Sequence, residues 1–82
     1  MNLKEARKNA GLTQEQAAAA LGVSSSAVCQ WETGMTRPSR NKWMKISEVY
    51  DLTPNQLFSA VVATQMEAFL DARQGQTETP GE

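Results

Sequence analysis

Apolar residues recur at intervals of three and four positions along most of the chain, a spacing typical of amphipathic helices. No stretch has the strict apolar–polar alternation of a β-strand, and no segment is repeated. The spacing predicts helices over residues 3–9, 14–21, 25–33, from about 39 or 41 to 50, and from 54 to about 73. The sequence therefore predicts an all-α fold of five helices.

Short polar residues mark the starts of several predicted helices. Thr13 and Gln16 have the spacing of a capping box, in which each side chain bonds the backbone N–H of the other residue. The same spacing recurs at Thr53 and Gln56, and Ser24 is a further candidate cap. Glycines that suit the left-handed end of a helix follow three segments, at Gly11, Gly22 and Gly34. These signals place the helix boundaries more firmly than the apolar spacing alone.

The last predicted helix is longer than a small core requires. Its apolar series runs through Leu57, Phe58, Val61, Val62, Met66, Phe69 and Leu70. If the helix end projects from the domain, the last four of these residues are exposed, and a symmetric dimer would bury them. The alternative is that the helix folds back over its own core. The chain thus divides into a domain over 1–58, an overlapping C-terminal helix over 54–73 and a disordered polar tail over 74–82.

Charge is divided unevenly along the 82 residues, whose net charge is only −1. Residues 1–45 hold seven Lys and Arg against three Glu, a net of +4, whereas residues 46–82 hold one Arg against six acidic residues, a net of −5. Since exposed charges act over roughly 10 Å, the basic half could face a polyanion while the acidic half keeps the molecule soluble. The alternative is that these charges are spread over the surface and only contact solvent.

The composition excludes several kinds of chemistry. The chain has no His and a single Cys, so neither an intrachain disulfide nor a metal-ligand cluster is expected, and no cofactor is implied. No nucleophile–base pair or phosphate-cradling glycine loop is present, so an enzyme is not expected. The free thiol and the absence of a signal peptide or membrane-length apolar run predict a cytoplasmic protein.

Residues 13–31 have the pattern of a helix-turn-helix, with two short helices joined by the turn at 22–24. The small Ala17 and Ala18 allow the close helix crossing that such a pair needs, although alanine-rich helical pairs also occur in unrelated bundles. The segment ARKNAGLTQEQAAAALGVSSSAVCQWETGMTRPS, followed by YDLTPNQLF, resembles the Cro/cI repressor family. The matching positions are Arg7, 11–14, 17–24, Val28, Trp31, Glu32, Gly34 and Pro38.

The resemblance covers residues 3 to about 58 and combines many positions at fixed spacing. It implies a five-helix, lambda-repressor-like DNA-binding domain, here with an extended C-terminal helix, whose ligand is double-stranded operator DNA. Members of the family are usually dimers. The resemblance also implies that Arg7 pairs with Glu32, which would brace the first helix against the helix that enters the major groove.

Specific DNA contacts follow from the same resemblance. The groove-facing, base-reading residues would be Ser25, Ser26, Cys29 and Gln30, which form adjacent rows one helical turn apart. The phosphate-contacting residues would be Arg7, Gln14, Ser24, Arg37, Arg40 and Lys42. The alternatives are that Ser24 is mainly a cap, that Ser25 and Ser26 are a polar first turn, that Gln30 is merely exposed and that Cys29 is structural.

The sequence therefore predicts a dimeric transcriptional regulator of the phage repressor type, Cro-like or cI-like, which acts by occupying an operator. A contact with RNA polymerase, for which Glu15 is a candidate by analogy, would allow activation. The alternative is an antitoxin or a restriction–modification controller protein whose C-terminal half binds a protein partner. No membrane and no small-molecule ligand are expected as partners.

Overall fold

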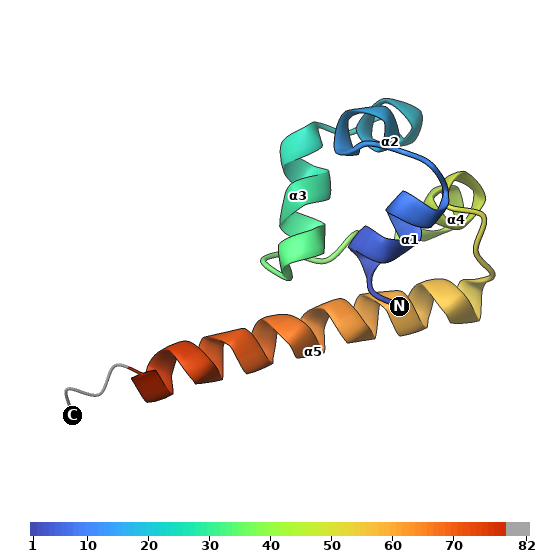
Figure 1. Cartoon of the computed structure of the whole chain (residues 1–82). Coiled ribbons are helices and arrows are strands. Elements are labelled where there is room, and N and C mark those ends of the chain that lie inside the picture. The colour runs from blue at the N-terminus through green and yellow to red at the C-terminus, as the bar shows by residue number, and fades with distance from the viewer. Residues whose placement is uncertain (79–82) are drawn as a thin grey trace.

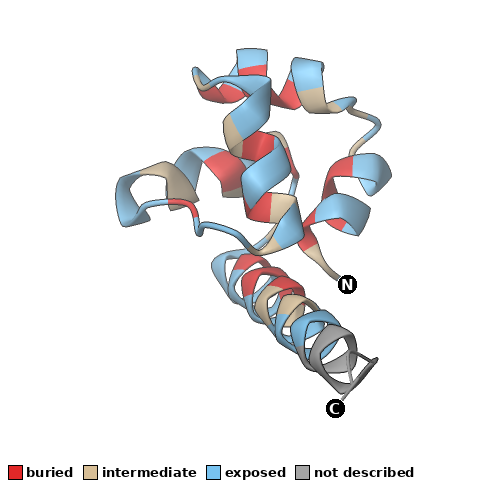
Figure 2. Cartoon of the chain, turned by 90° about the vertical axis from the view of Figure 1, so that its left-hand side faces the viewer, coloured by how far each residue is buried: buried red, intermediate tan, exposed pale blue. Residues whose placement is uncertain are grey.

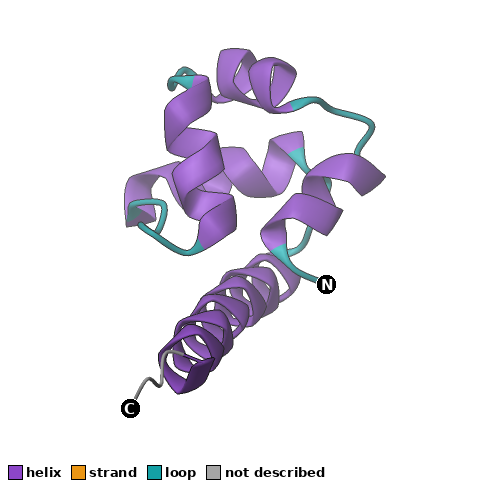
Figure 3. Cartoon of the chain, turned by 60° about the vertical axis from the view of Figure 1, so that its left-hand side comes forward, coloured by secondary structure: helices purple, strands orange, loops and turns teal. Residues whose placement is uncertain are grey.

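A computed structural model of the chain describes residues 1–78, with side chains described for residues 1–72. Five helices and no strands make up these residues (Figures 1 and 3). The helices are α1 (Leu3–Asn9), α2 (Gln14–Leu21), α3 (Ser25–Thr33), α4 (Arg40–Val49) and α5 (Pro54–Glu78). The all-α prediction is confirmed, and the bounds of the first three helices agree with those expected from the sequence.

The predicted helix caps are present. The Thr13 hydroxyl accepts the N–H of Gln16 at 3.1 Å, and the Gln16 side chain accepts the N–H of Thr13 at 3.0 Å. Thr53 and Gln56 form the same reciprocal pair at 3.1 and 2.9 Å. The Ser24 hydroxyl caps α3 by accepting the N–H of Ala27 at 3.1 Å. Each cap satisfies backbone donors that the first turn of a helix leaves without an intrahelical partner.

Two helix starts differ from simple expectation. A third capping box, between Asn2 and Glu5, begins α1 and was not predicted. Helix α4 begins at Arg40, and the Ser39 side chain makes no cap bond; its hydroxyl donates to the side-chain oxygen of Asn41 at 2.6 Å.

Helix α5 continues to Glu78, beyond the end expected near residue 73. Residues 74–78 have the sequence QGQTE, in which the two Gln and the Glu favour helix without needing a buried face. The predicted tail was inferred from polarity, and polarity alone does not end a helix. The remaining tail residues, 79–82, lie outside the described residues.

The core takes buried side chains from all five helices. Its largest fully buried side chains are Val28, Ile46 and Leu57, from α3, α4 and α5. Helices α1 to α4 form a body on one side of α5, and buried residues gather on the sides where the helices face each other (Figures 1 and 2). The body therefore holds α5 along one side and leaves its other side open.

The two sides of α5 differ in burial. Leu57, Ala60, Val61 and Thr64 pack against the body and are at most 4 % exposed. On the other side, the residues expected to mediate dimerisation are 42 to 57 % exposed, namely Val62, Met66, Phe69 and Leu70. The two sequence interpretations of this helix thus apply to different faces: one face covers the chain's own core, and the other is exposed.

Polar contacts fix α5 to the start of the chain. The buried Thr64 hydroxyl accepts the N–H of Leu3 at 2.9 Å and donates to the carbonyl of Ala60 at 2.9 Å. One turn further along α5, Glu67 accepts a bond of 2.8 Å from the Asn2 side chain. These bonds tie α1 to α5 directly.

Gly34, which ends α3, lies directly against α5. Its φ is +79°, and a β-carbon at this position would collide with the β-carbon of Ala68. We expect Gly34→Ala to lower the free energy of unfolding by about 2–4 kcal/mol, because backbone strain and overpacking add. Urea denaturation monitored by circular dichroism would measure this loss.

Gly22→Ala is the matched control, because Gly22 has a similar φ of +72° with nothing within 4 Å of the added carbon. Gly22→Ala should lower the free energy of unfolding only by the cost of backbone strain. Equal losses in the two variants would show that α3 and α5 are not closely packed at Gly34.

Candidate nucleic-acid interface

Helices α2 and α3 form the predicted helix-turn-helix. Gly22 adopts the left-handed conformation at the end of α2, and the N–H of Val23 bonds the carbonyl of Ala18 at 3.0 Å. Ala17 and Ala18, both nearly inaccessible, let α3 approach α2 closely. The turn therefore fixes the angle at which α3 leaves α2.

The predicted base-reading residues all lie on the exposed side of α3. Ser25, Ser26, Cys29 and Gln30 are exposed, whereas Val28 and Trp31 on the opposite side are buried, Val28 fully. The Cys29 thiol is free and exposed, in agreement with an outward position. Figure 2 looks onto this exposed side of α3. The structure thus brings the four residues together on one accessible surface.

Arg7 and Glu32 form the expected ion pair, and it is buried. Arg7 Nε donates to Glu32 Oε2 at 2.6 Å, and the two side chains are 7 % and 4 % exposed. A second guanidinium nitrogen, Nη1, donates to the carbonyl of Leu12 at 2.7 Å. This geometry favours the bracing role of Arg7 over the phosphate contact that was also expected of it.

Gln14 joins the same group of bonds. Its amide nitrogen donates to Glu32 Oε1 at 3.0 Å, so the carboxylate of Glu32 connects α1, α2 and α3. Gln14 is half-buried at the start of α2, where unpaired backbone N–H groups favour an anion. Glu32 therefore fixes the orientation of the side chain expected to contact a phosphate.

The other expected phosphate contacts surround this surface. Arg37 and Arg40 are exposed in and after the loop that follows α3, and Lys42 is half-buried in the first turn of α4. Ser24 is exposed, and its hydroxyl oxygen is engaged in the cap of α3. Three cations thus lie close together in sequence, next to a recognition helix that has none.

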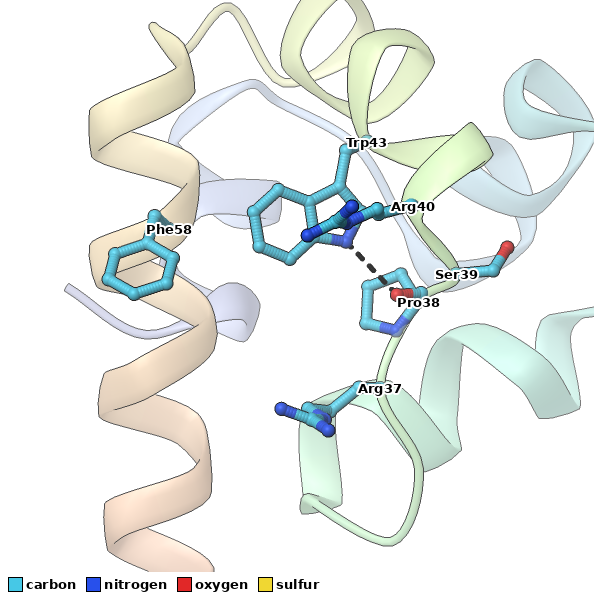
Figure 4. A pocket seen from close by; sticks show the side chains of 6 residues that line it. All are labelled: Arg37, Pro38, Ser39, Arg40, Trp43 and Phe58. Carbon is cyan, nitrogen blue, oxygen red and sulfur yellow. Dashed lines mark hydrogen bonds between the residues drawn. The ribbon is translucent and has the colours of Figure 1, made fainter.

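A cleft of about 570 Å³ lies between this loop, α4 and α5 (Figure 4). Its lining residues are Arg37, Pro38, Ser39, Arg40, Trp43 and Phe58. The Trp43 indole N–H donates to the carbonyl of Pro38 at 3.0 Å, and its ring centroid lies 6.2 Å from that of Phe58. Nothing in the sequence indicated that Trp43 of α4 meets Phe58 of α5.

This arrangement is that of a helix-turn-helix DNA-binding domain, in which the exposed second helix, α3, is braced by α1 and α2. A model of the helix-turn-helix family matches residues 3–57, and the chain belongs to this Cro/C1-type family of DNA-binding regulators, which is not an enzyme family. No curated protein and no solved structure matches the chain. In the described part of the chain, no helix combines the length and apolarity needed to cross a membrane.

The Arg7–Glu32 pair predicts a strong coupling energy. We expect Glu32→Gln to cost about 3–5 kcal/mol of stability, because the buried Arg7 charge loses its counter-charge. Adding Arg7→Met should cost little more, since the double variant holds no unpaired charge. A double-mutant cycle measured by urea denaturation would test this.

Glu15→Gln, at an exposed position of α2, is the control for loss of one carboxylate. Additive effects of the substitutions at Arg7 and Glu32 would contradict the proposed coupling.

Tyr50 reports on the same buried pair. The pKa of the Tyr50 phenol is raised to about 12, chiefly by burial and also by the Glu32 carboxylate, while Arg7 opposes the rise. The folded state therefore holds this proton at pH values where the unfolded chain, with a pKa near 10, loses it. The stabilising contribution of the Tyr50 phenol should be fully present below about pH 10. Between pH 10 and about 12, the free energy of unfolding should fall by about 1.4 kcal/mol per pH unit.

Chemical denaturation of wild type and Tyr50→Phe between pH 9 and about 12 would measure this slope. The variant should lack the Tyr50 contribution, while every other ionisable group is the same in both proteins. Identical slopes would show that the phenol titrates normally.

Proposed function

We propose that this chain is a sequence-specific transcriptional regulator that binds double-stranded operator DNA as a dimer, and acts as a phage-type repressor by occupying the operator. The observation that carries the proposal is the exposed row of short, uncharged side chains on α3, held by a buried ion pair and followed by a basic loop. Occupying a promoter would exclude polymerase.

Base reading is assigned to the outer side of α3. Ser25 and Ser26 are short, so they let the helix sit deep in the major groove. The amide of Gln30 can pair with N6 and N7 of one adenine, and Cys29 offers a soft contact to a thymine methyl group. These contacts would supply sequence preference without adding a cation to α3.

Affinity is assigned to phosphate contacts around α3. Arg37, Arg40 and Lys42 would meet the sugar-phosphate backbone on one side, and Gln14 with Ser24 would meet it at the starts of α2 and α3. Arg7 acts within this proposal as the brace that orients α3. The net negative charge of the chain is compatible with DNA binding because the cations are concentrated on this half.

Dimerisation is assigned to the exposed face of α5. A two-fold symmetric dimer would place two recognition helices about 34 Å apart on a palindromic site. The same exposed face also supports the second candidate function, an antitoxin or restriction–modification controller protein whose C-terminal half binds another protein. Glu15, exposed on α2, is available for a polymerase contact. Selection of bound duplexes from a random DNA pool tests operator binding, for which an enriched palindrome is expected, and a stable co-purifying protein partner would favour the second candidate.

Substitutions should separate base reading from phosphate binding. Gln30→Ala should relax the preference at one base pair at a cost of about 1–3 kcal/mol. Arg37→Ala and Arg40→Ala should weaken binding to every sequence, and each lost phosphate contact should reduce the salt slope by about 0.9. Titration of selected and scrambled duplexes at several salt concentrations would measure both effects.

Lys4→Ala is the matched control, because it removes an exposed cation on α1 that is outside the proposed interface. It should change the salt slope little. If Gln30→Ala lowered affinity equally for all sequences, its base-reading role would be refuted, and an unchanged slope in both arginine variants would refute their phosphate contacts.

A further inference from the structure

The cleft between the loop after α3, helix α4 and helix α5 combines two cations with two aromatic rings. Arg37 and Arg40 supply the cations, and Figure 4 shows both guanidinium groups directed toward α5. Trp43 of α4 and Phe58 of α5 supply an apolar wall. The volume of about 570 Å³ is within the range of small-molecule sites. Its size and lining therefore suit one small molecule.

The apolar wall is held in place by contacts within the chain. The Trp43 indole N–H donates to the carbonyl of the buried Pro38 at 3.0 Å, which fixes the orientation of the ring. The Phe58 ring centroid lies 6.2 Å from that of Trp43 at an interplanar angle of 47°, and Phe58 is 57 % exposed. Much of this wall is in contact with water, so a flat apolar group that covered it would be bound favourably.

The two guanidinium groups have no counter-charge in the described part of the chain. Neither the Arg37 nor the Arg40 side chain makes an ion pair or a hydrogen bond there. Residues 33–47 hold four cations and no acidic residue, and residues 54–66 of α5 hold no charged residue at all. Cations beside apolar walls attract and concentrate an anion. The cleft is therefore complementary in charge to an anionic molecule.

Double-stranded DNA would use the arginines of this cleft but not its aromatic wall. A duplex presents phosphates at its surface and keeps the faces of its bases stacked inside, so it can pair with the two arginines and leave the two rings uncovered. A planar molecule with an anionic group would use both parts. A guanidinium group binds a carboxylate or a phosphate through two parallel N–H groups, and aromatic rings pack favourably against one another.

We propose that the cleft binds a small aromatic anion. The ring of this ligand packs against Trp43 and Phe58. Its carboxylate or phosphate group pairs with Arg37 and Arg40. This departs from the expectation, drawn from the sequence, that no small molecule binds the chain.

The proposed site would also regulate DNA binding, a consequence that rests on the proposed function. Arg37 and Arg40 are the side chains assigned to DNA phosphates, and an arginine that is paired with the ligand is not available to a phosphate. The ligand should therefore release DNA. By linkage, DNA should weaken binding of the ligand by the same factor.

Two-dimensional NMR of the isotope-labelled chain tests ligand binding in the absence of DNA. The chain has two Trp residues and hence two indole N–H signals, which Trp43→Phe assigns. The probes are naphthoate and adenosine monophosphate, which distinguish a carboxylate from a phosphate as the anionic group. Naphthamide and adenosine are matched compounds without the charge, and cyclohexanecarboxylate and ribose phosphate are matched anions without the aromatic ring.

At least one aromatic anion should shift the indole signal of Trp43 and leave that of the buried Trp31 unchanged. Its uncharged counterpart should bind at least about tenfold more weakly, because charge-assisted hydrogen bonds are lost. Phe58→Leu should weaken binding about three- to tenfold through loss of an aromatic contact. Met44→Leu, at an exposed site of α4 outside the cleft, is the matched control and should not change it.

Titration of the selected duplex tests the effect on DNA. Ligand at ten times its own Kd should raise the apparent Kd for DNA by about tenfold, the value for mutually exclusive binding. Phe58→Leu should bind DNA normally and respond much less to the same ligand concentration. The anion without the aromatic ring, at equal concentration, controls for ionic strength.

The two measurements separate failure of this inference from failure of the proposed function. A selected duplex without binding of either aromatic anion, or equal binding of the uncharged counterparts, would overturn the cleft site and leave DNA binding intact. Ligand binding without any selected duplex would overturn the operator function and the regulation, while the cleft site would stand. Ligand binding that leaves DNA affinity unchanged would overturn the regulation alone.

A second copy of the chain is another possible occupant of the cleft. In that case the Trp43 indole signal would move with protein concentration in the absence of any ligand. That result would overturn the small-molecule site.

Discussion

The buried ion pair between Arg7 and Glu32 is the interaction on which the placement of the recognition helix depends. Glu32 lies in the last turn of α3, and its carboxylate accepts bonds from Arg7 of α1 and Gln14 of α2. Removing these charges from water is costly, so the arrangement is stable only while every partner is in place. No buried side-chain nitrogen or oxygen in the described residues lacks a hydrogen-bond partner.

Two supports therefore hold α3 at its two ends. At the start, the Ser24 cap and the glycine turn position it against α2, and at the end, Glu32 and the close contact of Gly34 with Ala68 hold it against α1 and α5. Tyr50 lies within the electrostatic influence of the same pair. Because α5 is one of the supports, the helix with the exposed apolar face also helps to set the orientation of α3.

Local signals explain why much of the fold could be predicted from the sequence. The capping boxes at Thr13 and Thr53 depend on residues three positions apart, and the exposed positions of α3 follow from helical periodicity. Contacts between distant segments could not be derived in this way. The bonds of Thr64 to Leu3, the meeting of Trp43 with Phe58 and the burial of Arg7 depend on how helices pack. Helix α5 ends at Glu78 and not near residue 73, because the apolar spacing from which its end was expected stops before the helix does.

The outer side of α3 is chemically separate from the supports that hold it. Within the described residues, the side chains of Ser25, Ser26, Cys29 and Gln30 make no hydrogen bond to the rest of the chain, and all four are exposed. Exposed substitutions away from such contacts usually change stability by no more than about 0.5 kcal/mol. These four positions can therefore diverge with little effect on folding, so that one scaffold can evolve, or be engineered, to carry many different recognition surfaces.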